Sequence, residues 1–565
     1  MPHVSHATLR RFFKFSVIAS LAIAGCGDED DGEDEGGVTG YFFGPVGAEV
    51  SFSIGGETLP ATIDTPTESN DYGAAVFHTA APLDATTSYD VAIESEPDGQ
   101  VCQVFAGASG TGEELSPTGA IRVGCEWRYD FVGRSSDDQE LAYSNNSRQV
   151  VIGGSNRTIG DTPPLGDGRF VAFRSSESAL APGSATEENI YYRDRLTGTT
   201  QLVSHAPDGG PADGRSELPA ISADGLHVIF QSAATNLVEG DTNDETDIFV
   251  WSALDDTITR VSVGENGEEA DGSSREATIS GDGTVVAFVT QALTVVPAAN
   301  DSGVNGKVVR IDLTTGERIV VTRQGTTGDP TSGATPMLSE DGNRLVYYAY
   351  PNVTSDVNPY LWDAFVYDHD DGSHWPITRT SAGGNRDQGF ESTSGYSRPS
   401  ISGDGKWATY GTSSTNLVDG VDDGLWHVYL VEVDACSAAS CNVVLLDAIG
   451  TELADESATS NHATLSYDGR WVAFSSAASN LGVANEGKDN AFIYDRETET
   501  LSPLTRISEG YGGTYTDAEF SPDGGYVAVG IYLEMDPRFD TDGLFVGYTG
   551  LSRAFSWLDG IIPVE

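Results

Sequence analysis

Short runs of alternating apolar and polar residues recur along most of the chain, and turn-forming residues separate them. The clearest stretch is Pro219–Val263, in which four such runs follow one another: AIS, LHVIFQS, DIFVWSAL and TITRVSV. Alternation over four to eight residues between glycine, aspartate and asparagine is typical of β-strands. No segment shows the 3.6-residue period of an amphipathic helix, so the pattern predicts an all-β chain.

An Asp-Gly dipeptide marks the same place in every copy of this stretch. It follows a short segment of small residues and precedes a β-rich run, which favours a tight turn between a first and a second strand. Successive aspartates are 57, 58, 59, 63, 64 and 55 residues apart, and they are Asp167, Asp224, Asp282, Asp341, Asp404, Asp468 and Asp523. Four-stranded units that cannot bury both faces alone stack radially, so we predict a seven-bladed β-propeller.

The repeat resembles that of TolB-type propellers of the bacterial envelope. The resemblance lies in S-x-D-G before an apolar strand and in a later strand that ends at a Thr-Gly-like turn, as in NIYYRDRLTG, VVRIDLTTG, AFVYDHDDG and AFIYDRETE. It extends from about Thr162 to the C-terminus and implies a propeller in the cell envelope. It implies little about activity, because such folds host binding, scaffolding and catalysis alike.

A strand from outside the seven units is expected to close the ring. The segment Arg148–Thr158 aligns with the fourth strand of the Pro219–Val263 unit and would complete the last blade. Ser552–Asp559 competes for the same place. Either strand would remove the exposed edges of an open ring.

Residues 1–25 have the pattern of an export signal, with Arg10, Arg11 and Lys14 before a short apolar segment. That apolar segment is too short to span a bilayer permanently. Ile23-Ala24-Gly25-Cys26 resembles the bacterial lipobox, which implies that Cys26 is acylated, becomes the mature N-terminus and anchors the protein to a membrane. The alternative is an ordinary signal peptide with an incidental cysteine.

Residues 26–37 are acidic and glycine-rich, and they contain no apolar residue after Cys26. We expect a disordered tether that acts as a solvated spacer. An alternative is that acidic residues directly after an acylated cysteine resemble the surface-export signals of some bacterial lipoproteins. The expected location is therefore the bacterial envelope, periplasmic or surface-exposed.

Residues 38–127 alternate apolar and polar residues between Gly, Pro and Asp turns, and they predict a small β-sandwich before the propeller of residues 128–565. The segment around Cys102 resembles small immunoglobulin-like modules of lipoproteins. Cys102 and Cys125 fall in the last two strands of the sandwich and are expected to form a disulfide in an exported protein. Cys436 and Cys441, separated by four residues in a propeller turn, are expected to form another. A metal site at this turn is the alternative and would need further ligands.

The chain carries 86 acidic and 30 basic residues, a net charge of −56. Such a surface repels phosphate backbones and excludes a nucleic-acid partner. An acidic surface also fits a saline habitat or a demand for divalent cations. We expect a monomer.

One acidic loop has the spacing of a cation site. In EGDTNDETD, oxygen-bearing side chains stand at every second position, at Asp241, Asn243, Glu245 and Asp247. Hard oxygen ligands suit a structural calcium ion, although the glycine and distal glutamate of an EF-hand are missing. The alternative is that these residues form Asx-turns that cap the loop between the second and third strands.

Motifs for catalysis are absent from the sequence: there is no G-x-S-x-G, no H-E-x-x-H, no phosphate-binding loop and no C-x-x-C. We therefore expect a non-enzymatic module that binds a protein, peptide or glycan. A first alternative is a polysaccharide lyase or hydrolase. Lyases that resemble this propeller hold a histidine-bound metal in the central funnel, which would require several of His205, His227, His427 and His462 to converge. A second alternative is a scaffold in envelope maintenance, by analogy with TolB.

Exceptional residues gather in the fourth and fifth blades and are the candidate ligand contacts: Trp362, His369, His374 and Trp426. The aromatic side chains are suited to stacking on a sugar or a peptide, or to packing between blades. The two histidines lie in the acidic turn YDHDDGSHWP, which suits a metal cluster or a solvated turn.

The lipid anchor is testable by fractionation. Replacing Cys26 by Ser removes the acylation site, so the variant should leave the membrane fraction and appear in the soluble fraction. If it still sediments with membranes in high salt, acylation of Cys26 does not anchor this protein.

Overall fold

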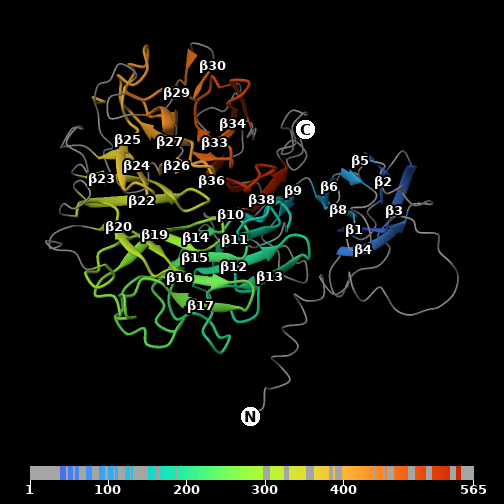
Figure 1. Cartoon of the computed structure of the whole chain (residues 1–565), viewed down its shortest axis with the longest axis horizontal. Helices are drawn as coiled ribbons and strands as arrows, with labels where there is room; N and C mark the ends of the chain where they lie inside the picture. Colours follow the sequence, from blue (N-terminus) through green and yellow to red (C-terminus); the bar gives the residue numbers. More distant parts are fainter. Residues whose placement is uncertain are drawn as a thin grey trace.

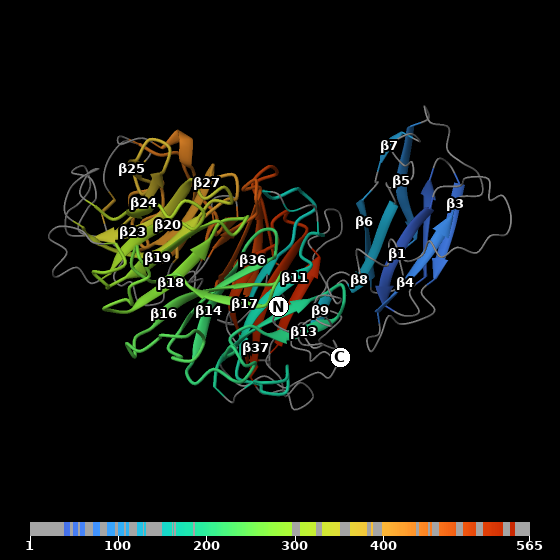
Figure 2. The same cartoon turned by 60° about the horizontal axis from the view of Figure 1, so that its bottom comes forward.

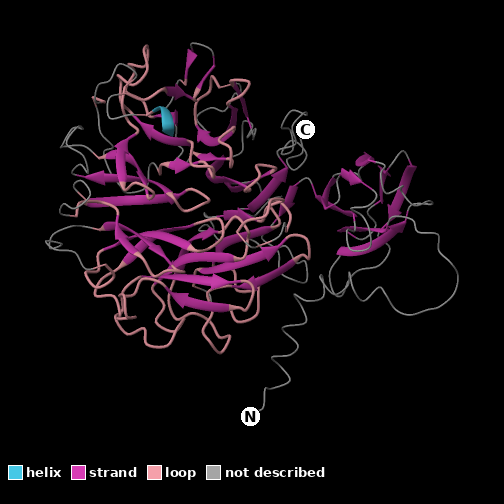
Figure 3. Ribbon diagram, viewed as in Figure 1, coloured by secondary structure: helices cyan, strands magenta, loops and turns pink. Residues whose placement is uncertain are grey.

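The computed structural model describes residues 39–45, 49–54, 57–62, 72–78, 88–95, 100–106, 109–111, 121–127, 129–131, 150–160, 162, 165–184, 187–296, 306–323, 330–350, 362–380, 386–387, 398–436, 440–449, 452–454, 463–481, 490–503, 512–534 and 543–548. Almost all regular structure in these residues is β-strand (Figure 3). The exception is a single turn of 3-10 helix, Val433–Ala435. No helix in the described part is long and apolar enough to cross a membrane. The signal, Cys26 and the acidic tether lie outside the described residues.

Two four-stranded sheets precede the propeller, with strand orders β4-β1-β8-β6 and β3-β2-β5-β7. Their strands are β1 (Thr39–Pro45), β2 (Glu49–Ile54), β3 (Glu57–Thr62), β4 (Tyr72–His78), β5 (Ser88–Ser95), β6 (Gln100–Ala106), β7 (Ser109–Thr111) and β8 (Ile121–Trp127). All pairs are antiparallel except β1 with β8. The register sets Cys102 opposite Cys125. The disulfide between them stays a prediction.

Seven further four-stranded antiparallel sheets form the propeller, as the repeat predicted. Blade 1 consists of β10 (Val150–Gly153), β11 (Phe170–Ser175), β12 (Asn189–Asp194) and β13 (Thr199–Leu202); blade 2 of β14 (Ser216–Ile221), β15 (His227–Ser232), β16 (Asp247–Ser252) and β17 (Thr257–Arg260); and blade 3 of β18 (Ser274–Ile279), β19 (Val285–Thr290), β20 (Lys307–Asp312) and β21 (Arg318–Val320). Blade 4 consists of β22 (Ser332–Leu338), β23 (Arg344–Tyr350), β24 (Asp363–Asp368) and β25 (Ser373–Pro376), and blade 5 of β26 (Ser400–Ile401), β27 (Trp407–Thr412), β28 (His427–Glu432) and β29 (Val443–Leu445). Blade 6 consists of β32 (Thr464–Leu465), β33 (Trp471–Ser476), β34 (Asn490–Asp495) and β35 (Thr500–Pro503), and blade 7 of β36 (Gly512–Phe520), β37 (Tyr526–Glu534) and β38 (Gly543–Tyr548) with β9 (Tyr129–Phe131). A small hairpin, β30 (Ala448–Ile449) and β31 (Glu452–Leu453), follows blade 5.

The blades follow one another in chain order around a ring. In Figure 1 the colours pass from teal through green, yellow and orange to red, and the red strands of blade 7 lie beside the teal strands of blade 1. Figure 2 shows the same sheets tilted, with β36 and β37 beside β11. The first strand of blade 1, β10, contacts both β36 and β37.

An N-terminal strand closes the ring, but the predicted segment was wrong. The closing strand is β9, Tyr129–Phe131, which pairs with β38. The segment Arg148–Thr158 instead contains β10, the first strand of blade 1, which pairs with β11. The reason is burial: VVIG is almost wholly buried, whereas a fourth strand such as β17 alternates exposed and half-buried side chains. Ser552–Asp559 lies outside the described residues.

The hydrophobic core lies between neighbouring blades. Second and third strands such as β11 and β12 are buried on both faces, which explains their nearly continuous apolar sequence. One core cluster joins Phe170 and Tyr192 of blade 1 to Phe230 and Trp251 of blade 2. Because burying each such side chain stabilises the fold by about 1.5–3 kcal/mol, each blade depends on both of its neighbours.

Several first strands carry a β-bulge at their centre, which the sequence did not predict. In blades 2, 3 and 4 the bulge includes a non-glycine residue in the left-handed region, Leu218, Glu276 and Thr335 respectively. The bulges link the blades, because the side chain of Gln231 accepts a hydrogen bond from the amide of Glu276, and Glu276 accepts one from the amide of Thr335. The bends therefore make backbone amides available for contacts between blades.

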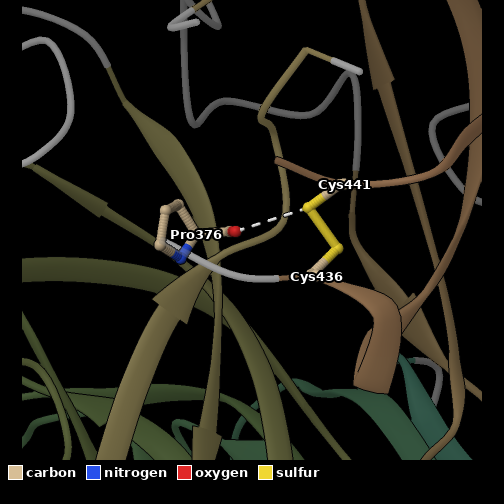
Figure 4. Close-up of a disulfide and its surroundings, with 3 residues drawn as sticks. All are labelled: Pro376, Cys436 and Cys441. Carbon is tan, nitrogen blue, oxygen red and sulfur yellow. Dashed lines mark hydrogen bonds between the residues drawn. A yellow bond between two sulfur atoms is a disulfide. The ribbon is translucent and has the colours of Figure 1, made fainter. Parts of the chain in front are cut away.

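The predicted disulfide in blade 5 is confirmed. Cys436 and Cys441 are joined across a Cα–Cα distance of 4.2 Å at the turn after the 3-10 helix (Figure 4). The sulfur of Cys441 lies 3.7 Å from the carbonyl oxygen of Pro376 in blade 4. Cys441 is buried in the core shared by blades 4 and 5, so the bridge lies against the neighbouring blade.

Two glycines in turns at the same end of the ring test how tightly the Asp-Gly turn of blade 2 packs. Gly225 belongs to that turn and Gly372 to the turn between the third and fourth strands of blade 4, and both have positive φ, 76° and 69°. A Cβ on Gly225 would lie 2.2 Å from a ring carbon of Phe170, whereas one on Gly372 would meet nothing within 4 Å. We expect Gly372→Ala to cost about 1 kcal/mol of unfolding free energy, and Gly225→Ala roughly 2–4 kcal/mol because overpacking is added. Equal losses of unfolding free energy for the two variants in urea denaturation would contradict the close packing of Gly225 on Phe170.

Candidate functional site

The Asp-Gly turns lie together at one end of the propeller and are held by hydrogen bonds. In blades 2 to 6 the turn aspartate accepts a hydrogen bond from the serine two residues before it and from the amide two residues after it; in blade 3 these are Ser280 Oγ at 2.8 Å and Thr284 N at 3.0 Å of Asp282. The other pairs are Ser222 with Asp224, Ser339 with Asp341, Ser402 with Asp404, and Ser466 with Asp468. The motif S-x-D-G is thus explained by a local Asx-turn.

The turns also bond to one another from blade to blade. Backbone amides donate to carbonyls of the next turn at 2.7–3.1 Å, in the pairs Gly154–Ala223, Asp224–Gly281, Gly281–Glu340, Glu340–Gly403 and Asp404–Tyr467. A Cβ on Gly403 would lie 2.4 Å from the ring of Tyr467, so the middle position of the motif is sterically restricted there. In blades 2 to 6 the middle residue of the motif therefore supplies the carbonyl that links its turn to the turn of the preceding blade.

Between blades 7 and 1 the turn aspartate is exchanged. The serine of blade 7, Ser521, donates to Asp167 of blade 1 at 2.9 Å, and Gly525 N donates to the same carboxylate at 2.9 Å. Asp167 thus takes the place that Asp523 would have in its own turn. Asp523 bonds instead to Ser155 Oγ at 2.8 Å and to the amide of Asn156 at 2.6 Å.

Arg157 reaches from the loop after β10 to three other blades. Its Nη atoms donate to both carboxylate oxygens of Glu340 in blade 4 at 2.9 and 3.0 Å, and its Nε donates to Asp523 at 2.5 Å. The guanidinium lies 3.8 Å from the ring centre of Tyr467 in blade 6. Burial disfavours the charge, but the hydrogen bonds to Glu340 and Asp523 outweigh it and raise the pKa of Arg157. One side chain of blade 1 therefore contacts three other blades at the Asp-Gly end of the ring.

The described histidines that were considered as ligands of a metal in the central funnel have different contacts. His205 contacts the carbonyl of Ala206 at 2.9 Å and Asp256 at 3.0 Å. His227 lies at the start of β15, 3.8 Å from Asp224. His462 lies outside the described residues. Among the described residues no three His, Cys, Asp or Glu side chains form a group that could hold a metal ion.

His427 belongs to a buried hydrogen-bond network in blade 5. Its Nδ1 lies 3.0 Å from Asp447 and its Nε2 3.1 Å from Asp423. Burial lowers the pKa of His427, but the two carboxylates outweigh burial and raise it. Both ring nitrogens are thus occupied by carboxylates. In blades 2 and 4 the corresponding positions hold Asp247 with Ser262 and Asp363 with Thr378.

The acidic loop predicted to bind calcium surrounds an arginine. Arg260 Nη1 lies 2.8 Å from Asp241 and 3.2 Å from Asp247. The side-chain nitrogen Nδ2 of Asn243 donates to Asp247, and Oδ1 of the same side chain accepts from the backbone amide of Glu245 in an Asx-turn. The carboxylate of Glu245 accepts a hydrogen bond from the Ser273 hydroxyl. Burial raises the pKa of Asp241 to about 6 against the effect of Arg260. The guanidinium stands among these oxygens where a cation was predicted, and calcium binding stays a prediction.

The four candidate contact residues do not form one site. Trp362 directly precedes β24 and His369 directly follows it, so a six-residue strand of about 20 Å separates them. His374 lies with His369 at the Asp-Gly end, and its Nδ1 is 2.8 Å from the Tyr347 hydroxyl. Burial lowers the pKa of His374 to about 4. Trp426 directly precedes β28 and thus lies at the same end as Trp362.

The two tryptophans are half-buried at the end of the ring opposite the Asp-Gly turns. Both pack on the core cluster of blades 4 and 5, and Trp362 also stacks on Tyr350 with ring centres 5.7 Å apart. Arg386 bridges the two blades beneath them, donating to Asp363 at 2.6 Å and to Thr412 at 3.3 Å. We refer to this end of blades 4 and 5 as the Trp end.

Blade 5 differs from the other blades beneath the Trp end. Most blades stack two aromatic rings between their second and third strands, for example Phe230 on Phe249 and Phe474 on Phe492. In blade 5 both are tyrosines, Tyr410 and Tyr429, with ring centres 5.7 Å apart. Both hydroxyls are buried and have no hydrogen-bond partner among the residues that the structure describes.

Sequence reasoning missed both Arg157 and these tyrosines. The signal for Arg157 was the extra length between VVIGG and the GDGR turn, where the other units pass directly from strand to S-x-D-G. The signal for the tyrosines was their place in the repeat, since WATYGT and HVYLVE align with copies that carry phenylalanine.

The comparisons with known proteins find similar propellers only at the level of structure. No protein-family model matches the sequence, and no curated protein matches it. An oligogalacturonate lyase in complex with manganese is 12% identical with a TM-score of 0.39, covering 67% of this chain and 86% of that one. An oligogalacturonate lyase of Vibrio parahaemolyticus is 11% identical with a TM-score of 0.39, covering 75% of this chain and 97% of that one. A TolB-like protein of Agrobacterium tumefaciens is 17% identical with a TM-score of 0.34, covering 60% of this chain and 95% of that one. Scores this low carry no argument about function, and the propeller is established by the seven sheets of this chain.

The energetic role of Arg157 can be measured against a matched control. Its side chain is 34% exposed, whereas Arg215, which also pairs with two glutamates, is 54% exposed. We expect Arg157→Ala to lower the unfolding free energy by about 1–2 kcal/mol, because Glu340 and Asp523 lose their partner. Arg215→Ala should cost at most about 0.5 kcal/mol. Equal effects in denaturant titrations would show that Arg157 does not hold the blades together.

Proposed function

We propose that this protein is a lipid-anchored, extracytoplasmic β-propeller that binds a glycan or a peptide at the Trp end of blades 4 and 5. The observation that carries the proposal is the departure of blade 5 from the repeat at that end. Tyr410, Tyr429, His427 and Asp447 replace residues that serve the same structural positions in other blades.

Stability alone does not account for the tyrosine pair. A buried hydroxyl without a partner costs about 1–3 kcal/mol, and phenylalanine at the same positions avoids that cost in blades 2 and 6. Residues that lower stability in one repeat only are typical of functional sites. The half-buried Trp426 and the partly exposed Asp423 add an aromatic face and a hydrogen-bond acceptor suited to a sugar or a peptide.

The opposite end of the ring supports the choice of the Trp end. There the turn residues bond to one another and Arg157 is held by Glu340, Asp523 and Tyr467, so these polar groups serve the fold. Loops on a rigid scaffold are the usual place for binding residues. The disulfide between Cys436 and Cys441 fits the oxidising compartment that an exported protein enters.

Binding is testable with arrays and one substituted position. The Cys26→Ser chain should bind a subset of glycans or peptides on an array, and Trp426→Ala should weaken that binding at least tenfold, since a stacking aromatic is lost. Leu254→Ala is the control, because Leu254 is 60% exposed in a turn at the other end.

Three experimental outcomes distinguish a binding site at the Trp end from the lyase and scaffold alternatives. Retained binding in the Trp426 variant, or equal loss in the Leu254 variant, would contradict a site at the Trp end. Turnover of a polysaccharide that a chelator abolishes would favour the lyase alternative. Capture of protein partners alone, with no glycan or peptide bound, would favour a scaffold of the envelope.

A further inference from the structure

The loop after β10 connects several blades at the Asp-Gly end of the ring. Its described residues, 154–160, 162 and 165, stand where the other blades have only the S-x-D-G turn. Arg157 bonds to blades 4 and 7, and Thr162 donates to Asp224 of blade 2 at 3.2 Å. We call these residues the stopper loop.

The stopper loop and the ring closure share one pair of carboxyl groups. Asp167 is 2% exposed and accepts a hydrogen bond from the backbone amide of Asp523 at 3.0 Å. The carboxylate of Asp523 in turn bonds to Ser155, Asn156 and Arg157. Two further charged groups pack at this junction. Glu340 reaches it through Arg157, and Arg195 donates to the carbonyl of Gly168 at 2.7 Å. Burial and the neighbouring Asp523 raise the pKa of Asp167 to about 7, against hydrogen bonds that lower it.

The hydrogen bonds around Asp167 can satisfy the carboxyl group in either protonation state. When it is ionised, it accepts from Ser521 Oγ, Gly525 N and Asp523 N. When it is protonated, it can donate to Ser521 Oγ, because that hydroxyl can turn toward the carbonyl of Tyr526, 3.3 Å away. Ser521 can therefore exchange donor and acceptor roles without movement of the backbone.

We infer that the junction of blades 7 and 1 is a proton-dependent latch: with Asp167 protonated the ring and the stopper loop are closed, and its ionisation beside Asp523 loosens both. The groups that lose order are the ones these carboxylates hold. They are the Ser521–Gly525 turn and the stopper loop with Arg157.

The direction of the pH effect follows from the bound proton. The carboxyl of Asp167 binds its proton more tightly in the closed ring than in the open chain, where the pKa is ordinary. Its contribution to closure is complete below the open-state pKa and is lost as pH rises through about 7. With these two values, the opening equilibrium should be about 30-fold larger at pH 8.5 than at pH 5.5.

Hydrogen–deuterium exchange of the full chain measures this opening locally. After correction for intrinsic exchange rates, peptides covering residues 154–160 and 512–528 should lose protection between pH 5.5 and pH 8.5, while peptides of β18 to β20 keep theirs. Asp167→Asn carries no charge at any pH, so the variant should show no pH-dependent loss at the junction. Asp468→Asn is the control, because Asp468 occupies the same turn position within blade 6 and bonds to its own Ser466.

A second variant keeps the test decisive if Asp167→Asn fails to fold. Asp523→Asn removes the charge that faces Asp167 and weakens the grip on Arg157. In this variant the protection of residues 512–528 from exchange should depend less on pH, and the protection of residues 154–160 should be low at both pH values. Equal protection of the wild-type junction at both pH values would overturn the latch. So would an unchanged pH dependence in Asp167→Asn.

Discussion

Closing the ring between the first and last blades is the constraint on which the rest of this structure depends. Each blade buries its second and third strands against both neighbours, so an open ring would expose the apolar faces of two blades at once. The cluster at the junction contains Val171, Phe173 and Tyr191 of blade 1 with Tyr526 and Ala528 of blade 7. Strand β9 and the exchanged Asp167 add a backbone pairing and a side-chain pairing to that contact.

The fold was predictable because its signals are local. A serine and an aspartate two residues apart satisfy one turn, and the turn recurs in every blade, so spacing alone gave the seven units. The disulfide between Cys436 and Cys441 was predictable for the same reason. Ring closure joins residues more than 350 positions apart, such as Ser521 and Asp167, and nothing local distinguishes them. Arg148–Thr158 was misassigned because its alignment with a fourth strand ignored that VVIG has no polar alternation to face solvent.

The candidate site was predicted less well. The four candidate contact residues were grouped by blade alone. Trp362 and Trp426 lie at one end of blades 4 and 5, whereas His369 and His374 lie at the other end, because a strand separates residues that are close in sequence. The alternating oxygens of Asp241 to Asp247 suggested a cation, and the structure supplies one from within the chain, Arg260. Long-range arginine pairs of this kind depend on which strand lies beside which loop, and a single sequence does not record that.

The two ends of the ring thus have different chemistry. At the Asp-Gly end, polar groups are paired with one another around Arg157, and at the Trp end blade 5 carries two buried tyrosine hydroxyls and a histidine bonded to two carboxylates. A crystal structure of the mature chain near pH 5.5 tests the central claim, the exchange of carboxylates at the ring closure, most directly. The account predicts Asp167 bonded to Ser521 and Gly525, with Arg157 between Glu340 and Asp523. Electron density showing Asp523 bonded to its own Ser521, as in the other blades, with Arg157 in solvent would contradict it.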